Sequence, residues 1–183
     1  LREINNPPII LFLKGDRGSL SIKKIALAII GTREPSKKGI WWAEKSAEFL
    51  AAEGANIVSG LAKGCDTAAH RGCLSANGIT IAFMAHGLNM IYPKENSILA
   101  RRIIEAGGSL VSEYAPGRMP FRTHFIERDR LQAGLSKGVI VAETDIRGGS
   151  MHTVRFAEQQ GKKVACLKYP EIVSHEKYHG NLM

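Results

Sequence analysis

The sequence predicts an α/β protein with a three-layer, Rossmann-like fold, in which a mostly parallel sheet has helices on both faces. Short apolar runs alternate along the 183 residues with segments of helical periodicity. The runs lack polar alternation, which is typical of strands buried on both faces of a parallel sheet. Nearly all glycine clusters follow the apolar runs, where a strand would turn into a helix. The length suits one sizeable α/β domain.

The expected elements follow one another in a regular order. Strands are expected at 23–30, 55–58, 79–84, 110–112, 139–143 and 163–168. Helices are expected at 38–53, 66–75, from 95 or 96 to about 106, 128–136 and 150–160. Gly54 can end the first helix in the left-handed conformation, and Gly161 ends the last one. Asp66 and Ser150 are expected to cap the helices that they open.

The chain is expected to divide into three parts. Residues 1–22 form a lead-in segment or strand, and 23–170 form the Rossmann-like domain. The tail, 171–183, resembles the start of a helix that would normally continue, so we expect an incomplete segment there.

Charge and cysteine content restrict the class of protein. The net charge of +8 favours polyanionic partners, although it could also serve solubility alone. Cys65, Cys73 and Cys166 are odd in number and lack CxxC spacing, which predicts reduced thiols in the cytoplasm and no metal site. No stretch reaches the roughly 18 apolar residues of a membrane span, so no membrane partner is predicted. No cofactor is predicted either.

The loops after the expected strands indicate anion binding. Ligands of such sheets lie beyond the carboxyl ends of the strands. Glycines let backbone amides approach a ligand closely, and a helix N-terminus adds partial positive charge. The candidate phosphate-binding residues are Gly31, Ser59, Gly60, Gly64, Gly148, Gly149 and Ser150. The alternative is that these glycines only make tight turns, and neither a GxGxxG nor a P-loop pattern is present.

Basic and aromatic side chains extend these loops. The candidate nucleic-acid-binding residues are Arg33, Lys63, Lys94, Arg122, Phe125, Arg128 and Arg130. Cations for phosphates beside aromatic faces for bases are typical of single-strand binding. Alternatively, Phe125 and Tyr92 pack in the core, and the arginines pair with Glu127 and Asp129. For Arg130, internal ion pairing is at least as plausible as a DNA contact.

Catalytic arrangements are weaker. The six histidines show no metal-ligand spacing, and no GxSxG motif is present. Glu113 and Glu143 end strands at the expected site and could be paired carboxylates. Orientation of basic residues or backbone amides is the favoured role for both. The sequence therefore predicts a binding protein rather than an enzyme.

Five stretches, in order, resemble the DNA-processing protein A family (DprA, also called Smf). They are KIALAIIGTREPSKKG, IVSGLAKGCDTAAHRGCL, IAFMAHGLNMIYPKEN, SEYAPGRMPFRTHFIERDRLQAGLS and GVIVAETDIRGGSMHT. The opening LREINNPPIILFLKGD is similar to the segment that precedes the Rossmann-like domain there, so the resemblance covers nearly the whole chain. It implies a protein that binds and protects single-stranded DNA in natural transformation without catalysis. Such proteins pass the strand to a RecA-type recombinase and commonly work as homodimers.

The resemblance also assigns residues by position. Arg33 matches the GTR arginine, Lys63 the basic residue of SGLARG and Lys94 that of the YPxEN stretch. Phe125, Arg128 and Arg130 match the NFPxRNR stretch.

The chain departs from the family pattern in three places. NFPxRNR becomes HFIERDR, which puts Glu127 and Asp129 beside the expected phosphate path, where acidic groups should weaken DNA binding. The usual GTGLDxIYP becomes AHGLNMIYP, with Ala85 and His86 in a glycine-rich turn, and SGAL becomes GGSM. The pattern is that of a divergent branch.

A second function of a different class remains open. The chain could be a nucleotide-like small-molecule binding protein or an enzyme similar to the cytokinin-activating phosphoribohydrolases. DIRGGSMHT lies where those enzymes have PGGxGTxxE. Arg147 replaces the proline, Met151 and His152 break the second glycine pair, and Phe156 stands where the catalytic glutamate would be. This argues against hydrolysis but not against binding. A weaker third possibility is a structural partner protein that binds neither ligand.

Overall fold

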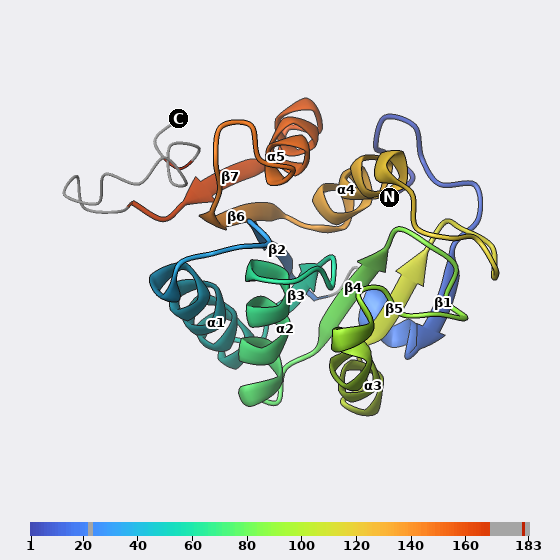
Figure 1. Cartoon of the computed structure of the whole chain (residues 1–183), viewed down its shortest axis with the longest axis horizontal. Helices are drawn as coiled ribbons and strands as arrows, with labels where there is room; N and C mark the ends of the chain where they lie inside the picture. Colours follow the sequence, from blue (N-terminus) through green and yellow to red (C-terminus); the bar gives the residue numbers. More distant parts are fainter. Residues whose placement is uncertain (22–23, 169–180, 182–183) are drawn as a thin grey trace.

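A seven-stranded sheet forms the middle layer of the protein (Figure 1). The computed structural model describes residues 1–21, 24–168 and 181. The strands are β1 (Phe12–Gly15), β2 (Ala26–Gly31), β3 (Asn56–Ser59), β4 (Thr80–Met84), β5 (Ser109–Ser112), β6 (Gly138–Glu143) and β7 (Lys163–Cys166). The order across the sheet is β1-β5-β4-β3-β2-β6-β7. Only the pairing of β1 with β5 is antiparallel among these described strands.

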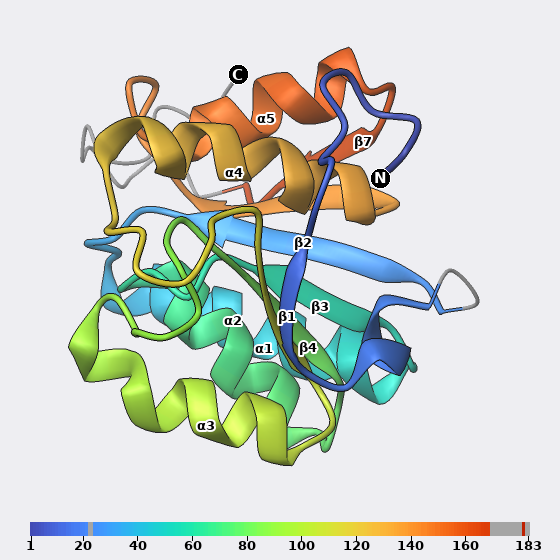
Figure 2. The same ribbon diagram turned by 90° about the vertical axis from the view of Figure 1, so that its right-hand side faces the viewer.

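Helices cover both faces of the sheet (Figures 1 and 2). One face carries α1 (Lys37–Ala52), α2 (Cys65–Ser75) and α3 (Ser97–Glu105), and the other carries α4 (Arg122–Leu135) and α5 (Ser150–Gln159). Two short 3-10 turns, η1 (Arg17–Leu20) and η2 (Lys94–Asn96), precede β2 and α3. The predicted fold class is thus confirmed. Of the expected tail, 171–183, all but Asn181 lies outside the described residues.

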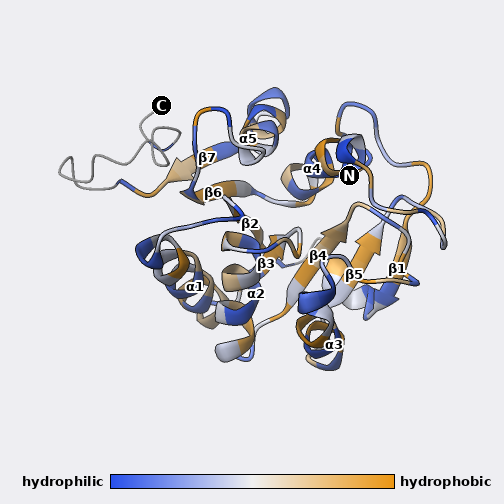
Figure 3. Cartoon of the chain, viewed as in Figure 1, coloured by the Kyte–Doolittle hydropathy of each residue, from blue (hydrophilic) through white to orange (hydrophobic). Residues whose placement is uncertain are grey.

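The core consists of two apolar layers, one on each face of the sheet. Alternate residues of β2 divide between them: Ala28 and Ile30 pack toward α4 and α5, whereas Ile29 packs against α1 and α2. A further cluster under α3 is built on Met84 and Ile103. Because both faces of the central strands are buried, those strands lack polar alternation. Figure 3 shows these strands as largely hydrophobic and the helices as mixed. None of the helices in the described part of the chain is long and apolar enough to cross a membrane.

The structure corrects three details of the sequence prediction. Helix α4 begins at Arg122 rather than at 128. The sequence did not reveal this start, because the first turn is largely polar and the N-cap residue, Phe121, has no side chain that can cap a helix. Gly64 and Gly149, not Asp66 and Ser150, are the N-cap residues of α2 and α5. The strand β7 is exposed at all four positions instead of buried. The lead-in, which was expected as a segment or a strand, supplies β1, an antiparallel edge strand of the same sheet.

Helices α1 and α2 approach so closely that one position has no room for a side chain. A Cβ on Gly72 would lie 2.0 Å from the backbone oxygen of Glu44. We expect Gly72→Ala to lower the free energy of unfolding by about 1–3 kcal/mol, because the helices must move apart. Urea titration followed by circular dichroism measures the change.

The matched control is Gly149→Ala, because a Cβ there meets nothing within 4 Å. Its effect should stay within about 0.5 kcal/mol. Equal effects of the two substitutions would contradict the close packing of α1 on α2.

Candidate functional site

The strand order creates a switch point between β2 and β6. From β2 the chain moves outward through β3, β4 and β5, and it then returns to place β6 on the other side of β2. Loops that leave neighbouring strands in opposite directions open a crevice at the carboxyl edge of the sheet. A cavity of about 720 Å³ lies there. Its wall residues come from the loop after β2, the start of α2, helix α4 and the loop between β6 and α5.

The floor of the cavity is polar and buried. It contains Asp66, Arg128, Asp129, Gln132 and Thr153, each less than one-tenth exposed. The Arg128 guanidinium donates through Nη1 to the carbonyl oxygen of Phe83 at 2.6 Å. Its Nε lies 3.2 Å from Oδ1 of Asp129, which makes a buried ion pair. A buried charge requires such partners.

The loop after β3 fits around this arginine. A Cβ on Gly60 would lie 1.8 Å from Nη1 of Arg128, so only glycine leaves room for the guanidinium. The Asp66 carboxylate accepts hydrogen bonds from the backbone amides of Gly60 and Ala62 at 3.1 and 3.3 Å. The Asp66 carboxylate therefore stabilises the loop between β3 and α2.

Burial changes the protonation of both floor aspartates. Removal from water raises the pKa of Asp129 to about 7, although the Arg128 guanidinium opposes the shift and the Asp66 carboxylate adds to it. Desolvation likewise raises the pKa of Asp66 above its usual range, against the attraction of Arg128 and hydrogen bonds from the loop. The charge of the floor therefore changes near neutral pH.

Aromatic and basic side chains form the rim of the cavity. The Arg33 guanidinium carbon lies 4.9 Å from the centre of the Phe125 ring, in a cation–π contact. The Tyr92 ring also contacts Phe125, with the two ring centres 5.9 Å apart. Tyr92, Phe121 and Arg122 also line the cavity and are exposed. The structure thus brings together Arg33, Arg122, Phe125 and Arg128 of the predicted binding residues.

Part of the predicted phosphate-binding set also lines the cavity. Gly31 lies at the end of β2, and Gly148, Gly149 and Ser150 precede or open α5. Helix α5 has no side-chain cap at its N-terminus, and the amides of Met151 and His152 donate instead to the carbonyl oxygens of Gly148 and Gly149 at 3.0 and 3.1 Å. The other three residues of the predicted phosphate-binding set, Ser59, Gly60 and Gly64, do not line the cavity. Ser59 is fully buried and its hydroxyl donates to the Ile29 carbonyl oxygen at 2.7 Å.

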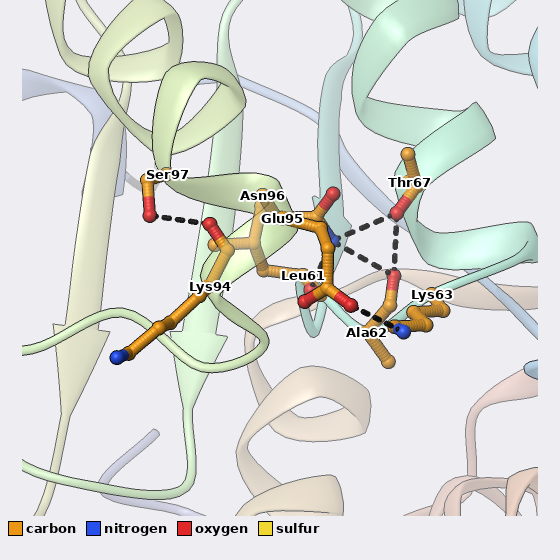
Figure 4. A network of polar contacts seen from close by, with 8 residues as sticks. All are labelled: Leu61, Ala62, Lys63, Thr67, Lys94, Glu95, Asn96 and Ser97. Atoms are coloured by element: carbon orange, nitrogen blue, oxygen red, sulfur yellow. Dashed lines mark hydrogen bonds and ion pairs between the residues drawn. The ribbon is translucent and has the colours of Figure 1, made fainter.

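Lys63 and Lys94 are not among the residues that line the cavity. Lys63 forms an exposed ion pair with Glu95, with Nζ and Oε1 2.5 Å apart. Asn96 ties the two loops together by donating to the carbonyl oxygen of Leu61 at 2.8 Å and to the Thr67 hydroxyl at 2.9 Å. Lys94 extends away from this network (Figure 4). A DNA contact by either lysine stays a prediction.

Arg130 points to the other side of α4. It is 5% exposed and donates to the carbonyl oxygen of Asn6 at 2.9 Å and to the Glu113 carboxylate at 2.6 Å. These contacts hold the lead-in segment against α4 and agree with the internal pairing considered from the sequence. The Glu143 carboxylate is buried and accepts from the backbone amide and hydroxyl of Ser36 at 2.9 and 2.8 Å. Both glutamates therefore orient other groups.

Sequence reasoning missed three floor residues: Asp66 as a cavity residue, Gln132 and Thr153. Their positions are far apart in the sequence, and no local motif connects them. A signal existed only for Gln132, which lies one helical turn after Arg128 and Asp129 and so shares their face of α4.

The comparisons with known proteins agree with this architecture. A family model described as DNA recombination-mediator protein A matches residues 1–183. The chain belongs to this family. Protein Smf of Escherichia coli is 41% identical over 163 residues, which cover 89% of this chain and 43% of Smf. The chain spans about half the length of the relatives that it matches.

Two solved structures of family members superpose closely on the chain. The X-ray structure of DNA processing protein A from Streptococcus pneumoniae has a TM-score of 0.85 at 41% identity, covering 94% of this chain and 59% of that one. A DNA processing protein A from Helicobacter pylori, described for its single-stranded DNA binding mode, also has a TM-score of 0.85, at 33% identity and covering 93% and 77%. The Rossmann-like domain expected from the sequence is the one that these structures contain.

Proposed function

We propose that the chain binds single-stranded DNA at the carboxyl edge of its sheet, across the rim of the cavity. The observation that carries the proposal is the Arg33 guanidinium held over the Phe125 ring beside exposed Tyr92 and Phe121. A cation next to accessible aromatic faces serves a phosphate and a base at once, as single-strand binding requires. The H. pylori relative with a described single-stranded DNA binding mode supports the same ligand.

Removal of Arg33 tests this proposal. Fluorescence anisotropy with labelled oligo-dT at low and moderate salt is expected to show salt-sensitive binding by the wild-type chain. Arg33→Ala should weaken binding by about tenfold or more, because it removes both the phosphate contact and the support for Phe125.

The matched control is Arg101→Ala, which removes the same charge from an exposed ion pair with Glu105 on α3. Its affinity should remain within about twofold of wild type. No binding at low salt, or equal loss in both variants, would overturn the proposal.

We further propose, from family membership, that the chain works in DNA uptake and recombination and passes the strand to a RecA-type recombinase as a cytoplasmic homodimer. The family description as a recombination mediator supports the recombinase partner. Sedimentation of the full-length protein with and without recombinase tests both associations. A monomer that does not co-sediment would overturn this part.

Binding without catalysis is part of the proposal. The competing function is a nucleotide-like small-molecule site or a phosphoribohydrolase-like enzyme, and the volume of the cavity would also suit a nucleotide. Incubation of the purified chain with nucleoside monophosphates separates the two. Release of a free base would favour the enzyme, and competition by a mononucleotide without turnover would favour the small-molecule site.

A further inference from the structure

Four lysines lie together at the amino edge of the sheet, opposite the cavity. Lys24 precedes β2, Lys137 precedes β6, and Lys162 and Lys163 precede and open β7. These three parallel strands are neighbours in the sheet, so they start at the same edge (Figure 1). Lys162 is half-buried and the other three are exposed. We call the four residues the amino-edge lysines.

The register of the sheet determines how closely these lysines gather. The backbone amide of Lys137 donates to the carbonyl oxygen of Ala26, two residues after Lys24, at 2.8 Å. Gly138 of β6 is the register partner of Lys163 of β7. Neighbouring strands lie about 4.8 Å apart, so the starts of three strands extend over about 10 Å. The fold therefore places lysines from three distant parts of the sequence in one row.

The amino-edge lysines have no ionic partners within the protein. None of them forms an ion pair in the part of the chain that the structure describes. Two exposed carboxylates belong to the same side of the sheet: Glu53 follows α1, and Glu158 lies in the last turn of α5. Since four lysines outnumber these two carboxylates, the edge keeps a net positive charge.

The helix dipoles account for only part of this charge. Lys137 and Lys162 follow the C-termini of α4 and α5, where a cation is favourable. Lys24 does not directly follow an α-helix, and Lys163 lies within β7. A polyanionic ligand gives all four lysines one role.

The composition of the edge indicates which polyanion it fits. The stretches 24–28, 135–139 and 160–165 contain no aromatic residue, whereas single-strand sites combine cations with aromatic faces on which bases stack. In a duplex the bases already stack on one another, and a protein can bind through phosphates alone. A duplex carries one charge per about 1.7 Å of its axis, so a row of about 10 Å meets several phosphates.

We propose that the amino-edge lysines bind the backbone of a DNA duplex without reading its sequence. The strand β6 separates this surface from the carboxyl edge by six residues, or about 20 Å. The inference goes beyond the proposed single-stranded DNA site and does not depend on it, because different residues carry it. The two edges together would let one chain hold a single strand and a duplex at the same time.

The test compares duplex and single-strand binding by one variant. The substitutions Lys24→Gln, Lys137→Gln and Lys163→Gln remove three charges and leave polar side chains at exposed positions. Anisotropy is measured with a labelled, blunt-ended duplex of about 20 base pairs between about 50 and 200 mM salt. The triple variant should bind the duplex about tenfold more weakly at the lowest salt, and the slope of log affinity against log salt should decrease by about 2–3. Its affinity for oligo-dT should stay within about twofold of wild type.

The matched control removes the same charge from exposed positions on α1, α2 and α3. Its substitutions are Lys45→Gln, Arg71→Gln and Arg101→Gln. The control should bind the duplex within about threefold of wild type, because only the overall charge has changed. Arg33→Ala should show the opposite pattern to the amino-edge variant, with oligo-dT binding weakened and duplex binding retained. Circular dichroism verifies that all three variants are folded.

The outcomes separate this inference from the proposed function. Absence of duplex binding by the wild-type chain at the lowest salt, or equal losses in the two triple variants, would overturn it. An equal loss of duplex and oligo-dT binding in the amino-edge variant would assign the edge to the path of the single strand instead. Equally tight binding of labelled polyglutamate would assign it to an acidic protein, and either result also overturns the proposal. Failure to bind oligo-dT alone would overturn the proposed function and leave this inference intact.

Discussion

Replacement of Arg128 by alanine is expected to lower the free energy of unfolding by about 3–5 kcal/mol. The guanidinium charge acts on two buried carboxylates and lowers the pKa of both Asp66 and Asp129 against the effect of burial. Without it, two acidic groups share a desolvated floor, and the carbonyl oxygen of Phe83 loses its 2.6 Å hydrogen bond. Chemical denaturation at about pH 8 measures the loss.

The control for this prediction is again Arg101→Ala on α3. Its ion pair with Glu105 is 3.6 Å long and largely exposed, so the expected change is within about 0.5 kcal/mol. A loss below about 1 kcal/mol for Arg128→Ala would show that the two aspartates hold protons readily and that the arginine is not their main partner.

The second large effect is a pH dependence of stability that arises from Asp129. The folded state binds a proton on this carboxyl up to about pH 7, whereas the reference pKa of the aspartyl group is 3.8. The unfolded chain therefore binds fewer protons between these values, and the contribution of Asp129 to stability falls as the pH rises from about 4 to 7. The full difference is roughly 4 kcal/mol, since one pKa unit corresponds to about 1.4 kcal/mol.

Asp129→Asn isolates this contribution from those of the other carboxylates. The amide keeps the size of the side chain and carries no charge at any pH. We expect the stability of the variant relative to wild type to increase as the pH rises from about 4 to 7 and to level off above about pH 7. A difference between the two proteins that does not change with pH would contradict the raised pKa.

The layers of the fold could be predicted because their signals are local. Apolar runs without polar alternation marked the central strands, and Gly54 ends α1 with a φ of +85° as its position predicted. The edge strands gave weaker signals. The strand β7 has an apolar sequence but exposed residues, because burial depends on what packs against a strand rather than on the strand itself.

The rim of the candidate site was predictable, and its floor was predictable only in part. Arg33 and Phe125 follow strand ends or open helices, so loop position and residue type were enough to select them. The sequence left internal ion pairing open for Arg130, but it did not show that Arg128 would be buried as well. Two positions on a helix differ by roughly 200° in direction. One arginine therefore lies in the cavity floor, and the other fastens the lead-in segment at the carbonyl oxygen of Asn6.

The close approach of Gly60 to Arg128 has an evolutionary consequence. A Cβ at position 60 would lie 1.8 Å from the guanidinium nitrogen, so neither residue can change independently without a clash or an uncompensated charge. We expect related sequences to substitute the two positions together, although β4 and β5 lie between them along the chain. A lineage that has lost Arg128 no longer requires glycine at position 60. Such paired changes would identify the lineages in which the ligand of this cavity has changed.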